Sequence, residues 1–400
     1  MVKAENVYVF VVCGDRQYTD SLNLAIQSLR KKSRNRIMVI TDSRRNQDMI
    51  SGAEVMDVET PSELNHHQAS VFLKTSVNRY VRNDHGLCCY LDSDIITSGD
   101  LPDDVFSHYR GIIGFAEDHL SLDLFSPYAV QCNCLNESRS KESLLHQAQN
   151  GYAEIQNSWH RFTDQSGGRD LQAIIAETRR LWMKNAAYLG LYMLKLNLPM
   201  FRKAPLKAYY FDKKENAWYD PEGRKILYPL IPYYEYIHQK TGFSYDKKGC
   251  FWFDGSRQDV CIPCCHHLHQ QIEKESGIKI RPADWQHWNG GMFVFSKDSD
   301  DFLDSWHDST MRIFKDPAWR TRDQGTLAMT AWKFGLQKTR LIPSVFNYIV
   351  DSGKAGLVWG ERGVSRDHGK TWDRPQMMHI YHRFGDESWD FWQFIKQNYL

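Results

Sequence analysis

The amino-terminal part of the chain alternates between short apolar runs and longer stretches with helical periodicity. Residues 7–12 (VYVFVV) and 36–41 (RIMVIT) are rich in β-branched and aromatic side chains, which is typical of buried strands. Between them, residues 20–32 carry apolar side chains at helical spacing, with Asp20 or Ser21 in position to cap the helix. A strand, a helix and a strand joined by short connections predict a parallel sheet covered by helices.

The same pattern continues on both sides of a long interruption. We expect strands at 87–91, 111–115, 292–295 and 340–342, and helices at 69–81, 299–314, 321–334 and 387–400. The alternation stops between residues 119 and 284, where a helical pattern at 169–198 precedes a stretch rich in Tyr and Pro. The prediction is an α/β fold with a mostly parallel sheet flanked by helices. It comprises a domain of residues 1–118 and 285–385, a large, partly helical insertion at 119–284 and a C-terminal helix at 386–400.

Composition narrows the range of functions without choosing one. With 42% hydrophobic residues the 400-residue chain can form a substantial core, and its net charge of +1 offers no general attraction for nucleic acid or an anionic membrane. No apolar stretch reaches the length needed to span a bilayer, and the N-terminus lacks the pattern of a signal peptide. Nine cysteines, an odd number, favour reduced thiols. We therefore expect a cytoplasmic protein with no membrane span and no nucleic-acid partner.

Two aspartates stand out because they interrupt apolar sequence. Residues 87–91 are followed by Asp92-Ser93-Asp94 and then by a second apolar run, Ile95-Ile96. A buried carboxylate without compensation would take up a proton or bind a cation. Two aspartates at a strand end can share Mg²⁺ or Mn²⁺ and leave positions open for phosphate oxygens. A solvated turn is the usual explanation of a bare Asp-x-Asp, but the apolar flanks favour a metal–diphosphate site.

Further polar residues are expected at the same edge of the sheet. Ligands of parallel sheets bind beyond the carboxyl ends of the strands, which places the segment from Cys13 to Tyr18, with Asp15, near the acidic pair. The helix predicted at 69–81 would bring Lys74 close to that pair.

Several short motifs follow one another in a fixed order. They are Asp15-x-x-Tyr18, Phe72-Leu73-Lys74, Asp92-x-Asp94, Asp118, Asn289-Gly290-Gly291, Asp323-Gln324-Gly325, Pro343 to Asn347, and His379. In this order, over residues 6–118 and 285–385, the chain resembles the GT-A nucleotide-diphosphosugar glycosyltransferases, in particular the glycogenin and lipopolysaccharide galactosyltransferase family. Each motif alone is weak, whereas the ordered set is specific.

The resemblance implies a role for each of these positions. The metal, Mn²⁺ or Mg²⁺, would be held by Asp92, Asp94 and His379. The nucleotide and its diphosphate would be bound by Cys13, Asp15, Tyr18, Lys74, Ser93 and Arg383. The donor sugar would be held and processed by Asp118, Asn289, Asp323 and Gln324. Arg383 departs from the family, which has a lysine here, but either cation can bind a phosphate.

Ordinary structural explanations compete with some of these roles. Lys74 would suit a solvated helix face, and Asp323 would suit the cap of a helix. Tyr18 would suit a hydrophobic core. His379 would suit a core position with its hydrogen bonds satisfied, and His382 is a rival for its role as a metal ligand.

A second group of metal-binding residue types lies in the insertion. It consists of Cys261, Cys264, Cys265, His266, His267 and His269. Cys261-x-x-Cys264 has the spacing of zinc ligands. A four-ligand site needs a second pair, and neither Cys250 nor Cys132 with Cys134 is singled out by its spacing. We therefore favour ordinary thiols and exposed imidazoles over a structural zinc ion.

The predicted function is metal-dependent transfer of a hexose from a nucleotide diphosphosugar, expected to be UDP-linked, to an acceptor bound by the insertion. The resemblance implies retention of the anomeric configuration, and the Glu and Asp residues of the insertion leave inversion open as the alternative. A nucleotidyltransferase on a similar sheet would need a glycine-rich basic loop after the first strand, and Cys13-Gly14-Asp15-Arg16 is not one. A carbohydrate- or partner-binding protein without catalysis would have no need of an intact Asp-x-Asp with His379.

Overall fold

The computed structural model describes residues 5–46, 48–81, 86–163, 203–206, 209–212, 217–219, 222–226, 231–351 and 356–400. It divides the chain into two compact units. We call Met1–Asn133 together with Cys264–Leu400 the sheet unit, and Cys134–Pro263 the inserted unit. The helix expected at 169–198 lies outside the described residues.

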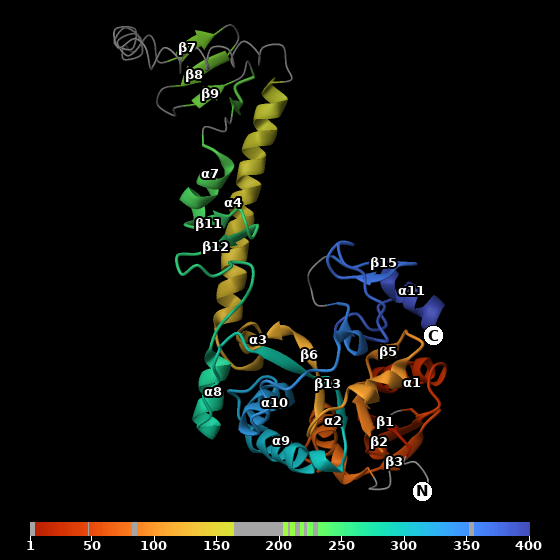
Figure 1. Ribbon diagram of the computed structural model, residues 1–400. Helices are drawn as coiled ribbons and strands as arrows, with labels where there is room; N and C mark the ends of the chain where they lie inside the picture. Colours follow the sequence, from red (N-terminus) through yellow and green to blue (C-terminus); the bar gives the residue numbers. More distant parts are fainter. Residues whose placement is uncertain are drawn as a thin grey trace. The chain divides into compact units, whose positions relative to one another are not determined.

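The sheet unit is built on a six-stranded sheet with the order β3-β2-β1-β4-β13-β6 (Figure 1). Its strands are β3 (Glu54–Asp57), β2 (Arg36–Thr41), β1 (Val7–Val12), β4 (Cys88–Leu91), β13 (Gln286–Phe295) and β6 (Gly114–Ser121). All run parallel except β13, which is antiparallel to its neighbours β4 and β6. This mostly parallel sheet confirms the predicted α/β class, and β1 and β2 have the predicted bounds.

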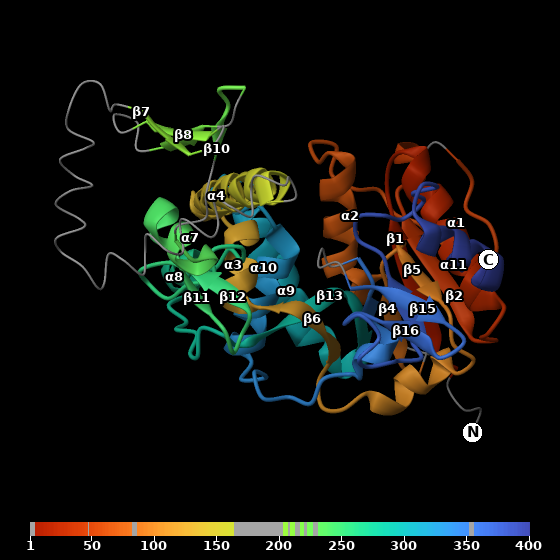
Figure 2. The same ribbon diagram turned by 90° about the horizontal axis from the view of Figure 1, so that it is seen from above.

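Helices cover both faces of this sheet, which explains why β1 is apolar at every position. The helices are α1 (Arg16–Arg30), α2 (His66–Thr75), α9 (Asp300–Ile313) and α10 (Arg322–Lys333). Tyr8 and Phe10 pack with the apolar stripe of α1, whereas Val9 and Val11 enter the opposite core with α2, α9 and α10. Figure 2 shows α1 and α2 on opposite sides of β1. In a strand that is buried on both faces, apolar and polar residues do not alternate, because neither face contacts solvent.

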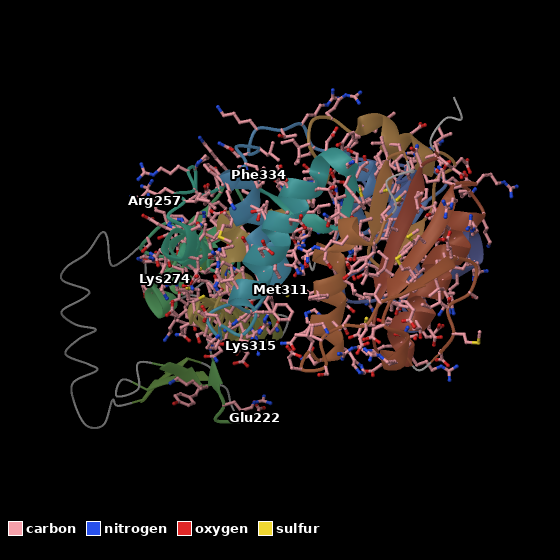
Figure 3. All side chains as sticks on the ribbon, turned by 90° about the horizontal axis from the view of Figure 1, so that it is seen from below. Glu222, Arg257, Lys274, Met311, Lys315 and Phe334 are labelled. Carbon is pink, nitrogen blue, oxygen red and sulfur yellow. The ribbon has the colours of Figure 1, made fainter. Side chains whose placement is uncertain are left out.

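Helices α9 and α10 pack against each other, and their hydrogen-bonded hydroxyls contribute to the contact. Thr310 and Thr326 are buried and lie 2.7 Å apart at their Oγ1 atoms. Met311 and Phe334, labelled in Figure 3, are partly buried apolar residues packed against the same core. Both helices fall where the sequence predicted them.

A second, three-stranded sheet joins parts of the chain that are far apart in sequence. Its order is β14 (Tyr348–Ile349), β17 (Met377–His379) and β5 (Ile95–Thr97). Strand β17 pairs antiparallel with β5, so that His379 lies opposite Ile95. A third segment, the C-terminal helix α11 (Asp390–Tyr399), buries Phe391, Trp392 and Ile395 in the core beside this sheet.

Several local predictions are wrong in detail. The strand predicted at 111–115 begins only at Gly114 and continues to Ser121 as β6, and the strand predicted at 292–295 already begins at Gln286 as β13. Helix α1 begins at Arg16 with Asp15 at the N-cap position, because its polar first turn is exposed and gives no apolar signal. The helix predicted at 69–81 ends at Thr75, after which a short 3₁₀ turn follows. Residues 340–342 form only a single bridge, between Ala116 and Ile342. Pro343 directly follows and lacks the N–H that a longer strand would use.

The inserted unit has its own small core. Helix α4 (Cys134–Thr163) packs with α7 (Tyr233–Thr241) and with the hairpin of β11 (Ser244–Asp246) and β12 (Phe251–Phe253) (Figure 1). The core residues are Leu145, Ala148, Ile237, Phe243, Trp252 and Val260. An antiparallel sheet of β7 (Lys203–Leu206), β8 (Tyr209–Asp212), β9 (Ala217–Tyr219) and β10 (Lys225–Ile226) belongs to the same unit. Within the described residues, no helix combines the length and apolar character needed to cross a bilayer.

Candidate functional site

Asp92, Asp94 and His379 converge at the carboxyl end of β4. Each offers one ligand atom, and these three atoms lie within 4.8 Å of one another. The backbone fixes the arrangement, because the Asp92 N–H donates to the Gly291 carbonyl at 2.8 Å and the Ile380 N–H donates to the Asp94 carbonyl at 3.1 Å. The pairing of β17 with β5 therefore delivers His379 to the aspartates across 285 positions of sequence.

The imidazole of His379 is oriented as a metal ligand would be. Its Nδ1 lies 2.9 Å from the side-chain oxygen of Asn347, so Nδ1 carries a proton, and in the neutral imidazole Nε2 is then an acceptor. That Nε2 lies 3.1 Å from Oδ1 of Asp94, and neither atom has a hydrogen-bond partner among the described residues. Two buried acceptors facing each other need a positive charge between them, so the residues fit a divalent cation.

The charges around His379 act in the same direction. Burial alone would lower the pKa of this imidazole, but the carboxylates of Asp94 and Asp92 outweigh burial and raise it. The site therefore attracts positive charge, either as a proton on the imidazole or as a cation bound to all three side chains.

Gly291 keeps the space between these ligands open. A Cβ atom built at this position would collide with Cε1 of His379 and would lie 2.9 Å from Oδ2 of Asp92. The second glycine of the Asn289-Gly290-Gly291 motif is thus required, because the side chains around it leave no room for a Cβ atom.

Lys74 lies beside the acidic pair at the C-terminal turn of α2, and it is 7% exposed. Its Nζ is 3.2 Å from Oδ2 of Asp92 and 3.2 Å from Oδ2 of Asp323. Burial alone would lower the pKa of Lys74, but the two carboxylates outweigh burial and raise it, so the side chain is a cation. Lys74 is therefore not on a solvated helix face. Asp323 does not cap α10, whose N-cap residue is Thr321.

A hydrogen-bonded network surrounds Asp118, which is 6% exposed at β6. Its Oδ2 accepts a hydrogen bond from Nδ2 of Asn289 at 2.9 Å, and its Oδ1 lies 3.0 Å from Nδ1 of His119. Burial alone would raise the pKa of Asp118, but His119, His287 and Asn289 outweigh burial and lower it. The carboxyl group is therefore ionised at neutral pH.

Tyr381 connects this network to the cluster of Asp92, Asp94 and His379, and no local sequence signal marks it. Its hydroxyl hydrogen-bonds with Asn289 and lies 3.4 Å from Oδ2 of Asp118. The ring of Tyr381 packs on that of His379, with 4.3 Å between centroids. Gln324 joins from α10, where its Oε1 accepts the Gly290 N–H at 3.1 Å.

The predicted nucleotide-binding residues divide into those near β1 and those elsewhere. Cys13 follows β1 and is buried, with its carbonyl oxygen 3.4 Å from Oγ of Ser70. Asp15 is exposed and lies 3.4 Å from Nδ1 of His66. Tyr18 is 45% exposed, so it is not a core aromatic. Ser93 lies between the two aspartates in the turn after β4.

Two further candidates follow His379 in the chain: His382, the rival metal ligand, and Arg383, the predicted phosphate-binding residue. His382 is exposed, so the structure brings His379 and not His382 to the aspartates. The guanidinium of Arg383 pairs with Asp386 at 2.7 Å and lies 4.8 Å from the ring of Trp389. As the structure stands, Arg383 is engaged within its own segment.

No protein-family model and no curated protein sequence matches the chain. Solved structures do match. The bifunctional glycosyltransferase WbbM, in its apo form, is 9% identical with a TM-score of 0.40, over 100% of this chain and 52% of WbbM. Mouse xyloside xylosyltransferase 1 is 8% identical with a TM-score of 0.36, over 95% of this chain and 99% of that protein. The galactosyltransferase LgtC is 18% identical with a TM-score of 0.22, over 28% of this chain and 46% of LgtC.

The chain thus spans about half the length of WbbM. The proteins in these structures are glycosyltransferases, the class that the sequence motifs resemble. Likenesses this distant assign no activity to this chain.

Proposed function

We propose that the protein is a metal-dependent hexosyltransferase whose donor is a nucleotide diphosphosugar, expected to be UDP-linked. The observation that carries the proposal is the cluster of Asp92, Asp94 and His379, in which Oδ1 of Asp94 and Nε2 of His379 are buried and face each other without a hydrogen-bond partner among the described residues. Carboxylate oxygens with one imidazole suit Mn²⁺ or Mg²⁺. When bound, the cation supplies Lewis-acid stabilisation of the diphosphate that departs as the glycosidic bond breaks.

Lys74 is suited to bind the diphosphate. An ammonium group has three N–H donors, and the structure shows two carboxylate partners, Asp92 and Asp323. One donor remains for a phosphate oxygen, and the charge of Lys74 would stabilise the leaving group. Arg383 would contribute only after exchanging Asp386 for a phosphate.

The network of Asp118 would hold the donor sugar. The carboxylate of Asp118 is surrounded by donors from His119, Leu120, Asn289 and Tyr381, so its expected role is to fix Asn289 and Tyr381 in place. These two side chains and Gln324 would then bind sugar hydroxyls. Retention of the anomeric configuration belongs to the proposal and is checked by NMR of the product's anomeric proton.

The experiment is a screen of sugar nucleotides with Mn²⁺, with Mg²⁺ and with a chelator, in which release of nucleoside diphosphate is measured. We expect release with a metal, and its loss in Asp92→Asn and Asp94→Asn. Asp308→Asn is the matched control, because Asp308 is an exposed carboxylate on α9 with 78% of its side chain accessible. Release that is insensitive to chelator and equal in all three variants would contradict the proposal. Release of pyrophosphate from a nucleoside triphosphate and a sugar phosphate would instead identify a nucleotidyltransferase.

A further inference from the structure

A second group of metal-binding side chains lies away from the aspartates. Cys132, Cys265 and His267 belong to the sheet unit, and each offers one ligand atom; these three atoms lie within 4.8 Å of one another. Cys134 belongs to the same group of side chains and follows Cys132 by two positions along the chain. All nine cysteines lie in the described residues, and none forms a disulfide.

The backbone holds Cys132 in place. The preceding residue, Gln131, donates its N–H to the carbonyl of Ala318 at 2.7 Å, and the N–H of Arg320 donates to the carbonyl of Ala129 at 2.8 Å. The guanidinium of Arg320 also donates to the carbonyl of Cys132 at 3.4 Å. Cys132 therefore sits on a fixed segment of the sheet unit.

Ser126 of α3 (Leu122–Ala129) contacts the segment that carries Cys265 and His267. Its Oγ accepts the N–H of Leu268 at 2.8 Å, which fixes the first turn of α8 (His267–Ser276). The same Oγ lies 3.2 Å from Sγ of Cys265. Because the hydroxyl oxygen already accepts from Leu268, its single proton can point at the sulfur. A hydrogen bond donated to a sulfur is the kind of second-layer contact that stabilises a metal-bound thiolate.

Two other side chains of this region, Cys264 and His269, have partners outside the cluster. Sγ of Cys264 lies 3.4 Å from Oδ2 of Asp123, and Nε2 of His269 lies 3.1 Å from the carbonyl of Ala283. Cys261 is exposed. The Cys-x-x-Cys spacing that first draws attention to this stretch is therefore not the pair that the fold assembles.

We propose that Cys132, Cys134, Cys265 and His267 bind a structural zinc ion. Three thiolates and one imidazole are a common tetrahedral ligand set for zinc. Softer thiolate ligands also separate this site from the oxygen-rich cluster of Asp92 and Asp94, which suits Mn²⁺ or Mg²⁺. Binding releases the thiol protons, so zinc affinity should fall at acid pH.

The positions of the four residues in the sequence indicate how a bound ion would stabilise the fold. Cys132 and Cys134 come where the chain leaves the sheet unit, and Cys265 and His267 come just after it returns. One ion would therefore tie together the two ends of a long excursion of the chain. Linking the ends of a long loop restricts the unfolded chain more than the folded one, which stabilises the fold.

The test begins with the full chain, purified without added metal and dialysed against metal-free buffer. We expect elemental analysis to find about one zinc ion per chain. Cys132→Ser and His267→Ala should each lower the zinc content at least about tenfold. Cys261→Ser and Cys264→Ser are the matched controls and should keep it. Asp94→Asn should also keep it, which separates this site from the proposed catalytic metal.

Cobalt gives a second measurement that does not depend on the yield of any variant. Metal-free wild-type protein loaded with Co²⁺ should show thiolate-to-cobalt charge-transfer absorption and tetrahedral d–d bands. A wild-type protein that holds no zinc and gives no such absorption would overturn the proposal. So would a zinc content that Cys264→Ser abolishes and Cys132→Ser leaves intact. Iron and inorganic sulfide found in place of zinc would also overturn the proposal and would identify an iron–sulfur cluster site.

Discussion

Substituting Gly291 by alanine adds one carbon atom at the centre of the proposed metal site. Gly291 does not have a positive φ, so alanine is compatible with the backbone and the effect would come from space alone. The new Cβ would collide with the ring of His379 and would lie 2.9 Å from both Oδ2 of Asp92 and Oδ1 of Asn289. Gly291→Ala therefore tests the site without removing any ligand.

The size of the effect follows from these distances. Ordinary van der Waals contact of a Cβ begins at 3.4 Å, so Asp92 must move by about 0.5 Å and His379 by more. Metal–ligand distances tolerate only about 0.2 Å. We expect affinity for Mn²⁺ to fall at least about 100-fold, which corresponds to about 2.7 kcal/mol. Overpacking should lower the free energy of unfolding by about 1–3 kcal/mol.

Calorimetric titration of Mn²⁺ in the presence of nucleoside diphosphate measures the first quantity, and urea denaturation measures the second. Gly290→Ala is the adjacent control, because its Cβ would meet Oε1 of Gln324 at 3.2 Å, the end of a flexible side chain. Gly255→Ala, with nothing within 4 Å, controls for the substitution itself. If Gly291→Ala folds and binds Mn²⁺ as the wild type does, the cation is not held by Asp92, Asp94 and His379.

Three further perturbations test neighbouring parts of the site. Lys74→Met should lower affinity for nucleoside diphosphate about tenfold and affect the nucleoside alone much less, as binding titrations of both would show. His379→Ala should abolish Mn²⁺ binding while His382→Ala should not, and the reverse result would move the ligand to His382. Burial lowers the pKa of His287 to about 4, so below pH 6.5 the unfolded chain takes up a proton that the folded one does not. Stability should fall by about 3 kcal/mol between pH 6.5 and 4, and urea denaturation of His287→Phe should show a smaller fall.

The strands of the central sheet could be predicted because burial on both faces leaves an unbroken apolar run. Val7–Val12 and Arg36–Thr41 are confirmed to the residue for this reason. Helix α4 was not predicted, because its buried residues Leu145, Ala148 and Tyr152 form only a short stripe in a helix of 30 residues that is otherwise mainly polar. The start of α1 was missed for the same reason, since its first turn is exposed.

The residues of the candidate site also fall into two groups: those marked by a local sequence pattern and those brought together only by distant contacts. Asp92 and Asp94 are conspicuous because apolar residues flank them, and that local contrast needs no knowledge of the fold. His379 was chosen through its order in the family resemblance. Its approach to Asp94 depends on the pairing of β17 with β5, which no local pattern encodes. Tyr381 and the cluster around Cys132 depend on equally distant contacts, so the sequence alone did not single them out.

The charges at the end of β4 favour joint binding of cation and diphosphate. Asp92 and Asp323 pair with the ammonium of Lys74, and Asp94 lies beside the imidazole of His379. With a neutral imidazole these groups carry a net charge of about −2, which a divalent cation neutralises, so that the site no longer repels a diphosphate. The diphosphate in turn adds oxygen ligands that the three side chains do not supply. Each ligand should therefore raise the affinity for the other by the same factor, as linkage requires. The N–H of Lys74 that is not paired with Asp92 or Asp323 would then face the phosphate.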